Sequence, residues 1–147
     1  MKAVGLFLLL SPIFSFTQIQ KTTLPESVKI GEVKSVGVFF AELSYIVVDQ
    51  DTVYNLMFKN QKYSSITDIQ SIQFSEDGET LGSLYQILNE TFDLEKGKHN
   101  TFKLGKQDIA ATLNKMMGTK YINVMIIGTG AYFNLTKKQL DKLFNKR

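Results

Sequence analysis

Cysteine and tryptophan are absent from this chain of 147 residues, which also has only one histidine and two prolines. Without cysteine there can be no disulfide bonds, thiol catalysis, thiolate metal sites or cysteine-linked lipid anchor. With a single histidine, a zinc site would have to rest mainly on carboxylates, which is uncommon. We therefore expect no cofactor and no structural metal, and a domain stabilised by its hydrophobic core alone.

Long apolar runs are also missing, apart from a short one near the N-terminus. A basic start at Lys2 precedes a mainly apolar segment, 3–16, and polar residues resume at Thr17. This order is typical of a secretory signal peptide, and the run is shorter than the ~20 apolar residues that span a bilayer. We expect residues 1–17 to be cleaved near Thr17/Gln18, leaving no stable membrane span, with an uncleaved signal anchor as the alternative. The protein would then act in the periplasm or outside the cell.

Neither sign of charge is strongly in excess. The chain has 17 Lys and Arg against 14 Asp and Glu, a formal net charge of +3 and a pI of about 9.0. Nucleic-acid-binding proteins usually concentrate more basic charge on one surface, so we expect no nucleic-acid partner. The small excess favours acidic partners or anionic envelope surfaces. A composition rich in Lys, Asn, Ile and Phe indicates a bacterial protein from an AT-rich genome.

The rest of the chain has the size of one domain. After the predicted signal peptide, a polar leader at 18–27 precedes residues 28–147, which no Gly/Ser/Pro linker and no sequence repeat divides. A chain of this length can bury about two thirds of its unfolded surface, which is enough for an independent fold. We therefore predict a single domain.

Alternating apolar and polar residues predict strands in the first half of the domain. Two such runs, 36–48 and 53–58, flank the polar residues 49–52. This arrangement is typical of a β-hairpin. A further short strand is expected at 71–74, and later ones at 101–104, 121–127 and 131–135. The last two surround Gly128-Thr129-Gly130, which predicts a second hairpin.

Three short helices are expected between and after these strands. The first follows Asp77, a plausible N-cap. The second is predicted from Asp108, as N-cap, to Gly118, as C-terminal stop. The third begins at Thr136, which can form a capping box with Gln139. Four apolar residues would lie on one face of the second helix: Ile109, Leu113, Met116 and Met117. The predicted class is α+β, a single small domain with a largely antiparallel sheet built from hairpins and about three short helices packed on it.

Candidate catalytic or metal-binding residues are few. His99 lies in a predicted loop without any nucleophile motif, so we interpret it as a solvated residue. The acidic groups at 49–51 and 76–79 do not follow the ligand spacing of a calcium loop. Gly128 and Gly130 lack the third glycine of a dinucleotide-binding fingerprint. We therefore predict no catalytic, cofactor-binding or metal-binding residue.

The last predicted helix breaks a local rule at its start. Lys137 and Lys138 occupy its first turn, where the helix dipole disfavours cations by a few tenths of a kcal/mol or more each. Free backbone N–H groups beside two lysines could hold a phosphate or a carboxylate. Lys137 and Lys138 are therefore candidate contacts to an anion or a partner, and a solvated helix face is the plainer interpretation.

Three functions from different classes fit these observations. We favour an exported, non-enzymatic binding or accessory domain that acts on a protein or an envelope component. The first alternative is a small exported hydrolase that uses two carboxylates at a separation of ~5–10 Å. The second is a small-molecule binder with a pocket between sheet and helices. Four aromatic residues could line that pocket, although they also suit a core: Tyr45, Tyr54, Tyr85 and Phe92.

Overall fold

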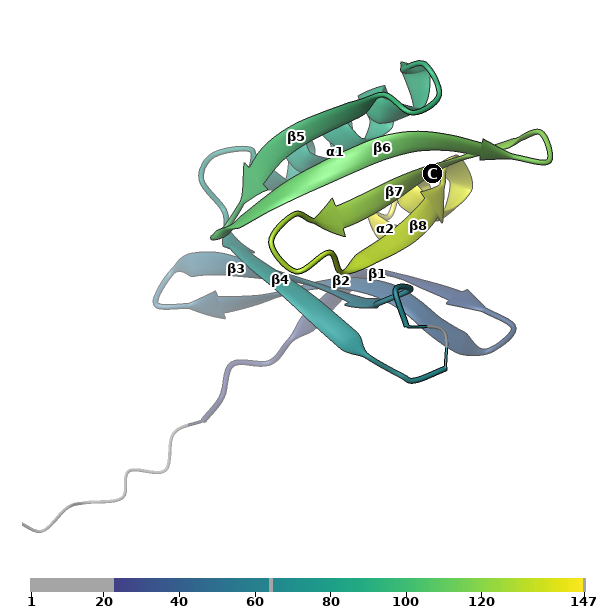
Figure 1. The fold of residues 1–147 in the computed structure, drawn as a ribbon. Helices are drawn as coiled ribbons and strands as arrows, with labels where there is room; N and C mark the ends of the chain where they lie inside the picture. The colour runs from purple at the N-terminus through teal and green to yellow at the C-terminus, as the bar shows by residue number, and fades with distance from the viewer. Residues whose placement is uncertain (1–22, 64, 147) are drawn as a thin grey trace, which may run out of the picture.

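The computed structural model of the chain describes residues 23–63 and 65–146 (Figure 1). The predicted signal peptide, residues 1–17, lies outside the described residues, and its cleavage stays a prediction. Within the described part, no helix is both long and apolar enough to cross a membrane.

The first half of the domain is a meander of four antiparallel strands followed by a helix. Its strands are β1 (Val28–Ser35), β2 (Val38–Val48), β3 (Asp51–Lys59) and β4 (Ile69–Ser75). Helix α1 (Thr80–Glu90) follows and continues into a short 3-10 helix, η1 (Thr91–Asp93). This sheet contains the hairpin predicted around residues 49–52, with a turn of only two residues, 49–50.

The second half has the same order of elements. Strands β5 (His99–Leu104), β6 (Gln107–Met116), β7 (Thr119–Ile126) and β8 (Tyr132–Thr136) form another antiparallel meander, and helix α2 (Lys137–Leu143) follows. The described chain is therefore built from two units of four strands and one helix, although its sequence shows no repeat.

Each helix packs against the sheet of the other unit. Helix α2 contacts β1 and β2 as well as its neighbour β8, while η1, which extends α1, contacts β6 and β7. The backbone carbonyls of Lys142 and Leu143 occupy the space that a side chain at Gly31 would need. The two units are interlocked by this exchange of helices.

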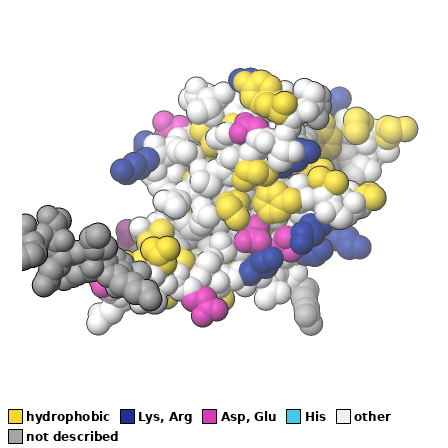
Figure 2. All heavy atoms as spheres, turned by 90° about the horizontal axis from the view of Figure 1, so that it is seen from below, with side chains coloured by type: hydrophobic (Ala, Val, Ile, Leu, Met, Phe, Trp, Pro, Cys, Tyr) yellow, Lys and Arg dark blue, Asp and Glu magenta, His cyan; other side chains and the backbone are white. Residues whose placement is uncertain are grey.

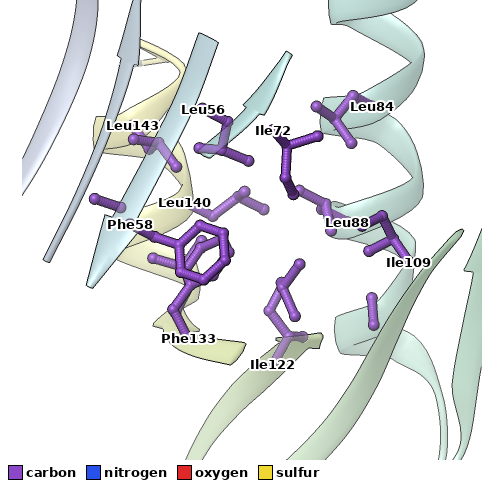
Figure 3. Close-up of a cluster of buried hydrophobic side chains, with 14 of the residues drawn as sticks. Leu56, Phe58, Ile72, Leu84, Leu88, Ile109, Ile122, Phe133, Leu140 and Leu143 are labelled. Atoms are coloured by element: carbon purple, nitrogen blue, oxygen red, sulfur yellow. The ribbon is translucent and has the colours of Figure 1, made fainter. Parts of the chain in front are cut away.

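A single hydrophobic core lies between the two sheets and the two helices (Figure 3). Phe58 of β3 stacks on Phe133 of β8 with ring centroids 4.5 Å apart, which joins the two sheets at the centre of the core. The backbone extends this junction, because Gln61 N donates to Tyr132 O at 2.8 Å and Tyr132 N donates to Asn60 Oδ1 at 3.1 Å.

The predicted α+β class is correct in outline but wrong in detail. The structure has two four-stranded sheets instead of one, and its described residues contain two α-helices instead of about three. The helix predicted between Asp108 and Gly118 is in fact strand β6. Ile109, Ala111 and Leu113 are all buried, which is the period of two of a strand. Ile109 and Leu113 are four residues apart, a spacing that fits either structure.

The first and third predicted helices are present, and both begin close to the residues expected from the sequence. Helix α1 begins after Glu79 instead of Asp77, and its first N–H groups are satisfied from outside the helix, with Thr80 N donating to Glu76 Oε1 at 2.7 Å. The capping box of Thr136 and Gln139 at the start of α2 is confirmed.

Candidate functional site

Among the residues that the structure describes, three hairpins turn through two residues that both have positive φ, the pattern of a type I′ turn. The turns are Val36-Gly37, Asp49-Gln50 and Met117-Gly118. Glycine, asparagine and aspartate tolerate this conformation, whereas a left-handed backbone costs other residues roughly 1–2 kcal/mol. Val36 and Met117, both with φ of 49°, are therefore strained at the first turn position.

The side chains at these two strained positions point into solvent. Val36 is 100% exposed and Met117 is 97% exposed, and their neighbours Val38 and Met116 are exposed as well. Each turn therefore combines an unfavourable backbone conformation with an apolar side chain that contributes nothing to the core. We call the exposed residues Val36, Val38, Met116 and Met117 the hairpin-tip surface.

Both tips lie at the same end of the molecule. The β1–β2 and β6–β7 turns are on the right in Figure 1, and hydrophobic side chains project at this end in Figure 2, with basic side chains close by. A groove of about 560 Å³ connects the two units here, because Phe40 of β2 lines it together with Met116, Met117 and Tyr121 of the β6–β7 hairpin.

Amide side chains form the polar wall of this groove. Asn123 Nδ2 donates to Asn134 Oδ1 at 3.0 Å, and Asn134 Nδ2 donates to Gln61 Oε1 at 2.7 Å. Gln61 Nε2, at the end of this row, is buried and has no acceptor within the described residues. The groove thus offers apolar contacts beside a row of amides that are hydrogen-bonded to one another.

Basic residues flank both tips. Lys34 precedes the β1–β2 turn, and Lys115 and Lys120 enclose the β6–β7 turn. Lys34 Nζ pairs with Glu32 at 2.8 Å, and Lys120 Nζ donates to the carbonyl of Phe92 at 3.1 Å. Residues 33–41 and 109–140 contain no Asp or Glu. The β6–β7 tip is therefore both apolar and basic, whereas the β1–β2 tip is apolar with its lysine neutralised by Glu32.

The opposite end of the first sheet is acidic. Asp49 lies in the β2–β3 turn and Asp51 begins β3, and the residues before α1 include Glu76, Asp77 and Glu79. These two segments are neighbours, because Glu76 N donates to Thr52 O at 2.9 Å. Strand β2 separates this end from the β1–β2 tip by its 11 residues, or about 35 Å.

The structure gives Lys137 a local role. Its Nζ lies 2.7 Å from Asp141 and 3.0 Å from Tyr85 Oη, which itself donates to Asp141 at 2.8 Å. Desolvation would lower the pKa of Lys137, but the hydrogen bonds to Asp141 and Tyr85 outweigh it and raise that pKa above its ordinary value. The same lysine is the first cause of the lowered pKa of Asp141.

Lys138 is exposed and has no ion pair within the described residues. It shares a shallow basic surface with Lys137, Lys142 and Lys146. Helix α2 has only seven residues, and Lys137 is already neutralised by Asp141. The anion contact at Lys137 and Lys138 stays a prediction. The ion pair with Asp141 explains why a lysine stands at position 137 in the first turn of α2.

The other residues considered from the sequence do not come together. His99 is an exposed residue of β5, opposite Thr112. Tyr45 and Tyr54 line a shallow pocket of about 390 Å³, but Tyr85 of α1 donates to Asp141 of α2 and Phe92 is buried in the core. Among the described residues, no three His, Cys, Asp or Glu side chains form a group suited to a metal ion.

Sequence reasoning missed the hairpin-tip surface, although part of its signal was present. Val36-Gly37 and Met117-Gly118 each put a glycine at the second turn position between runs of β-formers, which is a hairpin signal. Because 108–118 was interpreted as a helix, Gly118 was read as the end of that helix and not as part of a hairpin turn. The juxtaposition of the two tips could not be inferred, because it depends on how the two sheets pack.

Comparison with known proteins adds no functional information: no family model, curated protein or solved structure matches the chain significantly.

Proposed function

We propose that the protein is an exported, non-enzymatic binding domain that acts on a protein or an envelope component, in the periplasm or outside the cell. The observation that supports this most is the hairpin-tip surface. In its two turns, valine and methionine are exposed in a strained backbone conformation that asparagine would adopt more easily. Residues that violate local preferences without a folding benefit are concentrated at functional sites.

The location of the strain supports contact with a partner. The third type I′ turn, at Asp49-Gln50, also places a strained residue, Gln50, at positive φ, but both of its side chains are polar. The apolar exceptions are confined to the β1–β2 and β6–β7 turns, and Met116 and Met117 of the second turn line a groove together with Phe40 and Tyr121. Apolar side chains gathered at one exposed site are typical of an interaction surface.

The carboxylates give less support to the hydrolase alternative. Glu32 and Asp141 have lowered pKa values, for which the hydrogen bonds from Lys34 and Lys137, respectively, are the first cause. A catalytic acid needs a raised pKa. Glu42 and Asp108 are also ion-paired, with Lys29 and Lys103.

A small-molecule ligand is the second candidate function. The groove beside the tips has a volume in the range of small-ligand sites, about 300–1,000 Å³. Phe40, Met116 and Tyr121 would give such a ligand apolar contacts.

Site-specific photo-crosslinking in the producing cells tests the proposal. A benzophenone amino acid placed at Met117 should give an adduct with an envelope component, because this side chain is 97% exposed at the proposed contact. The same amino acid at Val48, which is 40% exposed at the opposite hairpin, is the matched control. Equal adduct yields at the two positions, or none at either, would contradict the proposal.

A further inference from the structure

We infer that the hairpin-tip surface attaches the protein to an anionic phospholipid surface. This inference rests on the proposed function and names its partner. Three observations carry it: the shape of the tips, the charge around them and a like-charge pair at the base of one hairpin.

The tips have the shape of inserting groups. Val36 and Met117 stand at the apices of two turns with almost their entire side chains in solvent. A rigid protein partner would need a matching cavity for each apex, whereas a lipid interface accepts protruding apolar side chains without one. Methionine is also flexible enough to adapt to such an environment.

The charge around the tips matches a negative surface. Lys115 and Lys120 flank the β6–β7 apex, where no acidic residue occurs in 109–140, whereas Lys34 beside the β1–β2 apex is paired with Glu32 at 2.8 Å. Apolar insertion combined with lysine contacts to anionic headgroups is the recognised physical basis of interfacial binding. The acidic end of the first sheet would face away from the lipid. The uneven distribution of charge would therefore turn the hairpin tips toward the lipid surface.

A pair of opposed lysines also indicates that an anion binds at the base of the β6–β7 hairpin. Lys115 and Lys120 are directly opposite each other in the β6–β7 register. Like charges at directly opposed positions destabilise a strand pair. A lipid phosphate at the base of the hairpin would neutralise this repulsion while Met116 and Met117 enter the apolar layer.

The absence of tryptophan from the chain allows a direct test with one fluorophore. Met117→Trp places it at the proposed insertion point, and Val48→Trp places it at the opposite hairpin as a control. Mixed with vesicles of equal parts phosphatidylcholine and phosphatidylglycerol, Met117→Trp should show a blue-shifted emission and quenching by brominated lipid. Val48→Trp should show neither, and vesicles of phosphatidylcholine alone should produce a much smaller effect.

A second pair of substitutions separates binding from folding. Val36→Asn with Met117→Asn creates two Asn-Gly turns, which the type I′ geometry prefers, so the variant should unfold at the same or a higher temperature. Its binding to the anionic vesicles in a sedimentation assay should nevertheless weaken by about tenfold or more, because the apolar apices are gone. Val47→Asn, at the far end of β2, should bind like the parent protein.

The lysines are tested in the same assay. Lys115→Gln should weaken binding to anionic vesicles and reduce its dependence on salt, and the β-hairpin should be no less stable, because one of the opposed charges is removed while the hydrogen bond from Lys120 to Phe92 is kept.

Four results would overturn the inference. These are an unshifted Met117→Trp emission with anionic vesicles, full vesicle binding by the asparagine variant, equal binding to neutral vesicles, and a blue shift without lipid that accompanies dimer formation in sedimentation. A Met117 crosslink to a protein without vesicle binding would refute the lipid partner and leave the proposed function standing. Failure of both experiments would refute both.

Discussion

Gly31 is a single position at which two elements approach too closely for any side chain. The carbonyls of Lys142 and Leu143 in α2 lie in the space that a methyl group on Gly31 would occupy. Gly31→Ala should therefore push α2 off β1 and lower the free energy of unfolding by about 1–3 kcal/mol, as overpacking in a core does. Urea denaturation measures this loss.

Gly82 is the matched control for this substitution. It lies inside α1 with open space around the position of a methyl group. Gly82→Ala should raise the free energy of unfolding by about 0.5–1 kcal/mol, because alanine favours the helix. If both variants changed stability in the same direction, the close contact between β1 and α2 would be wrong.

Tyr54 should make stability depend on pH at the alkaline end. Burial is the first cause that raises the pKa of Tyr54 to about 12, and the neighbouring Glu76 is the second. The unfolded chain releases the same proton near pH 10. The folded state therefore binds more protons between these values, and the free energy of unfolding falls as the pH rises from about 10 to about 12, with the contribution intact below that window.

Tyr54→Phe tests this dependence with little change in packing, since its ring can keep the contact with Phe74 at 5.3 Å between centroids. Urea denaturation across the alkaline window should show a shallower decline for the variant. A phenolate absorbance titration should also lose one late step. An unchanged slope together with an unchanged titration would show that another group is responsible.

Helix α2 is a docked element despite its seven residues. Leu140 and Leu143 are fully buried, and Phe144, which caps the helix, packs against Tyr85 with ring centroids 5.4 Å apart. Phe144→Ala should lower the free energy of unfolding by about 2–4 kcal/mol. Thr136→Ala should lower it by about 1 kcal/mol, because the capping box is lost.

Thermal and urea denaturation of these two variants can be compared with Lys138→Ala, which changes an exposed residue of the same helix and should leave stability almost unchanged. If Phe144→Ala were as stable as Lys138→Ala, the docking of α2 would be wrong.

Sequence patterns predicted those elements whose signals are local. The β2–β3 hairpin alternates cleanly around polar turn residues, and Thr136 with Gln139 forms a capping box within four residues. Strand β6 was misassigned because Ala110 and Ala111, both buried, are too small to mark a face, so the spacing of Ile109 and Leu113 with Met116 and Met117 suggested a helix. Alanine also has a high intrinsic helix propensity. This segment is a strand because it pairs with β5 on one side and β7 on the other.

The candidate site was less predictable than the elements. Lys137 stood out from the sequence, but the contact that explains it involves Tyr85, which is 52 residues away. The apolar tips depended on Met116 and Met117 being exposed, whereas a helical interpretation placed them on a buried face. Side-chain exposure follows from packing between sheets, which no local pattern encodes.

The whole described domain should behave as one cooperative unit, because each unit's helix completes the other unit's core. Leu140→Ala removes a fully buried side chain of α2, next to strands of both sheets (Figure 3). It should lower the free energy of unfolding by about 2–5 kcal/mol. Native-state hydrogen exchange should show equal losses of protection in β3 and β7. Loss confined to the sheet that contains β3 would indicate two independent units.

The contact between Gly31 and Leu143 also bears on the order of events during synthesis. More than a hundred residues separate these two positions, so β1 leaves the ribosome well before the helix that covers it. Domains tend to fold as units when their chain is complete, and long-range contacts slow folding. The first sheet would remain without its cover until α2 emerges. Such a delay would suit the export proposed above, because a general secretion channel accepts unfolded chains.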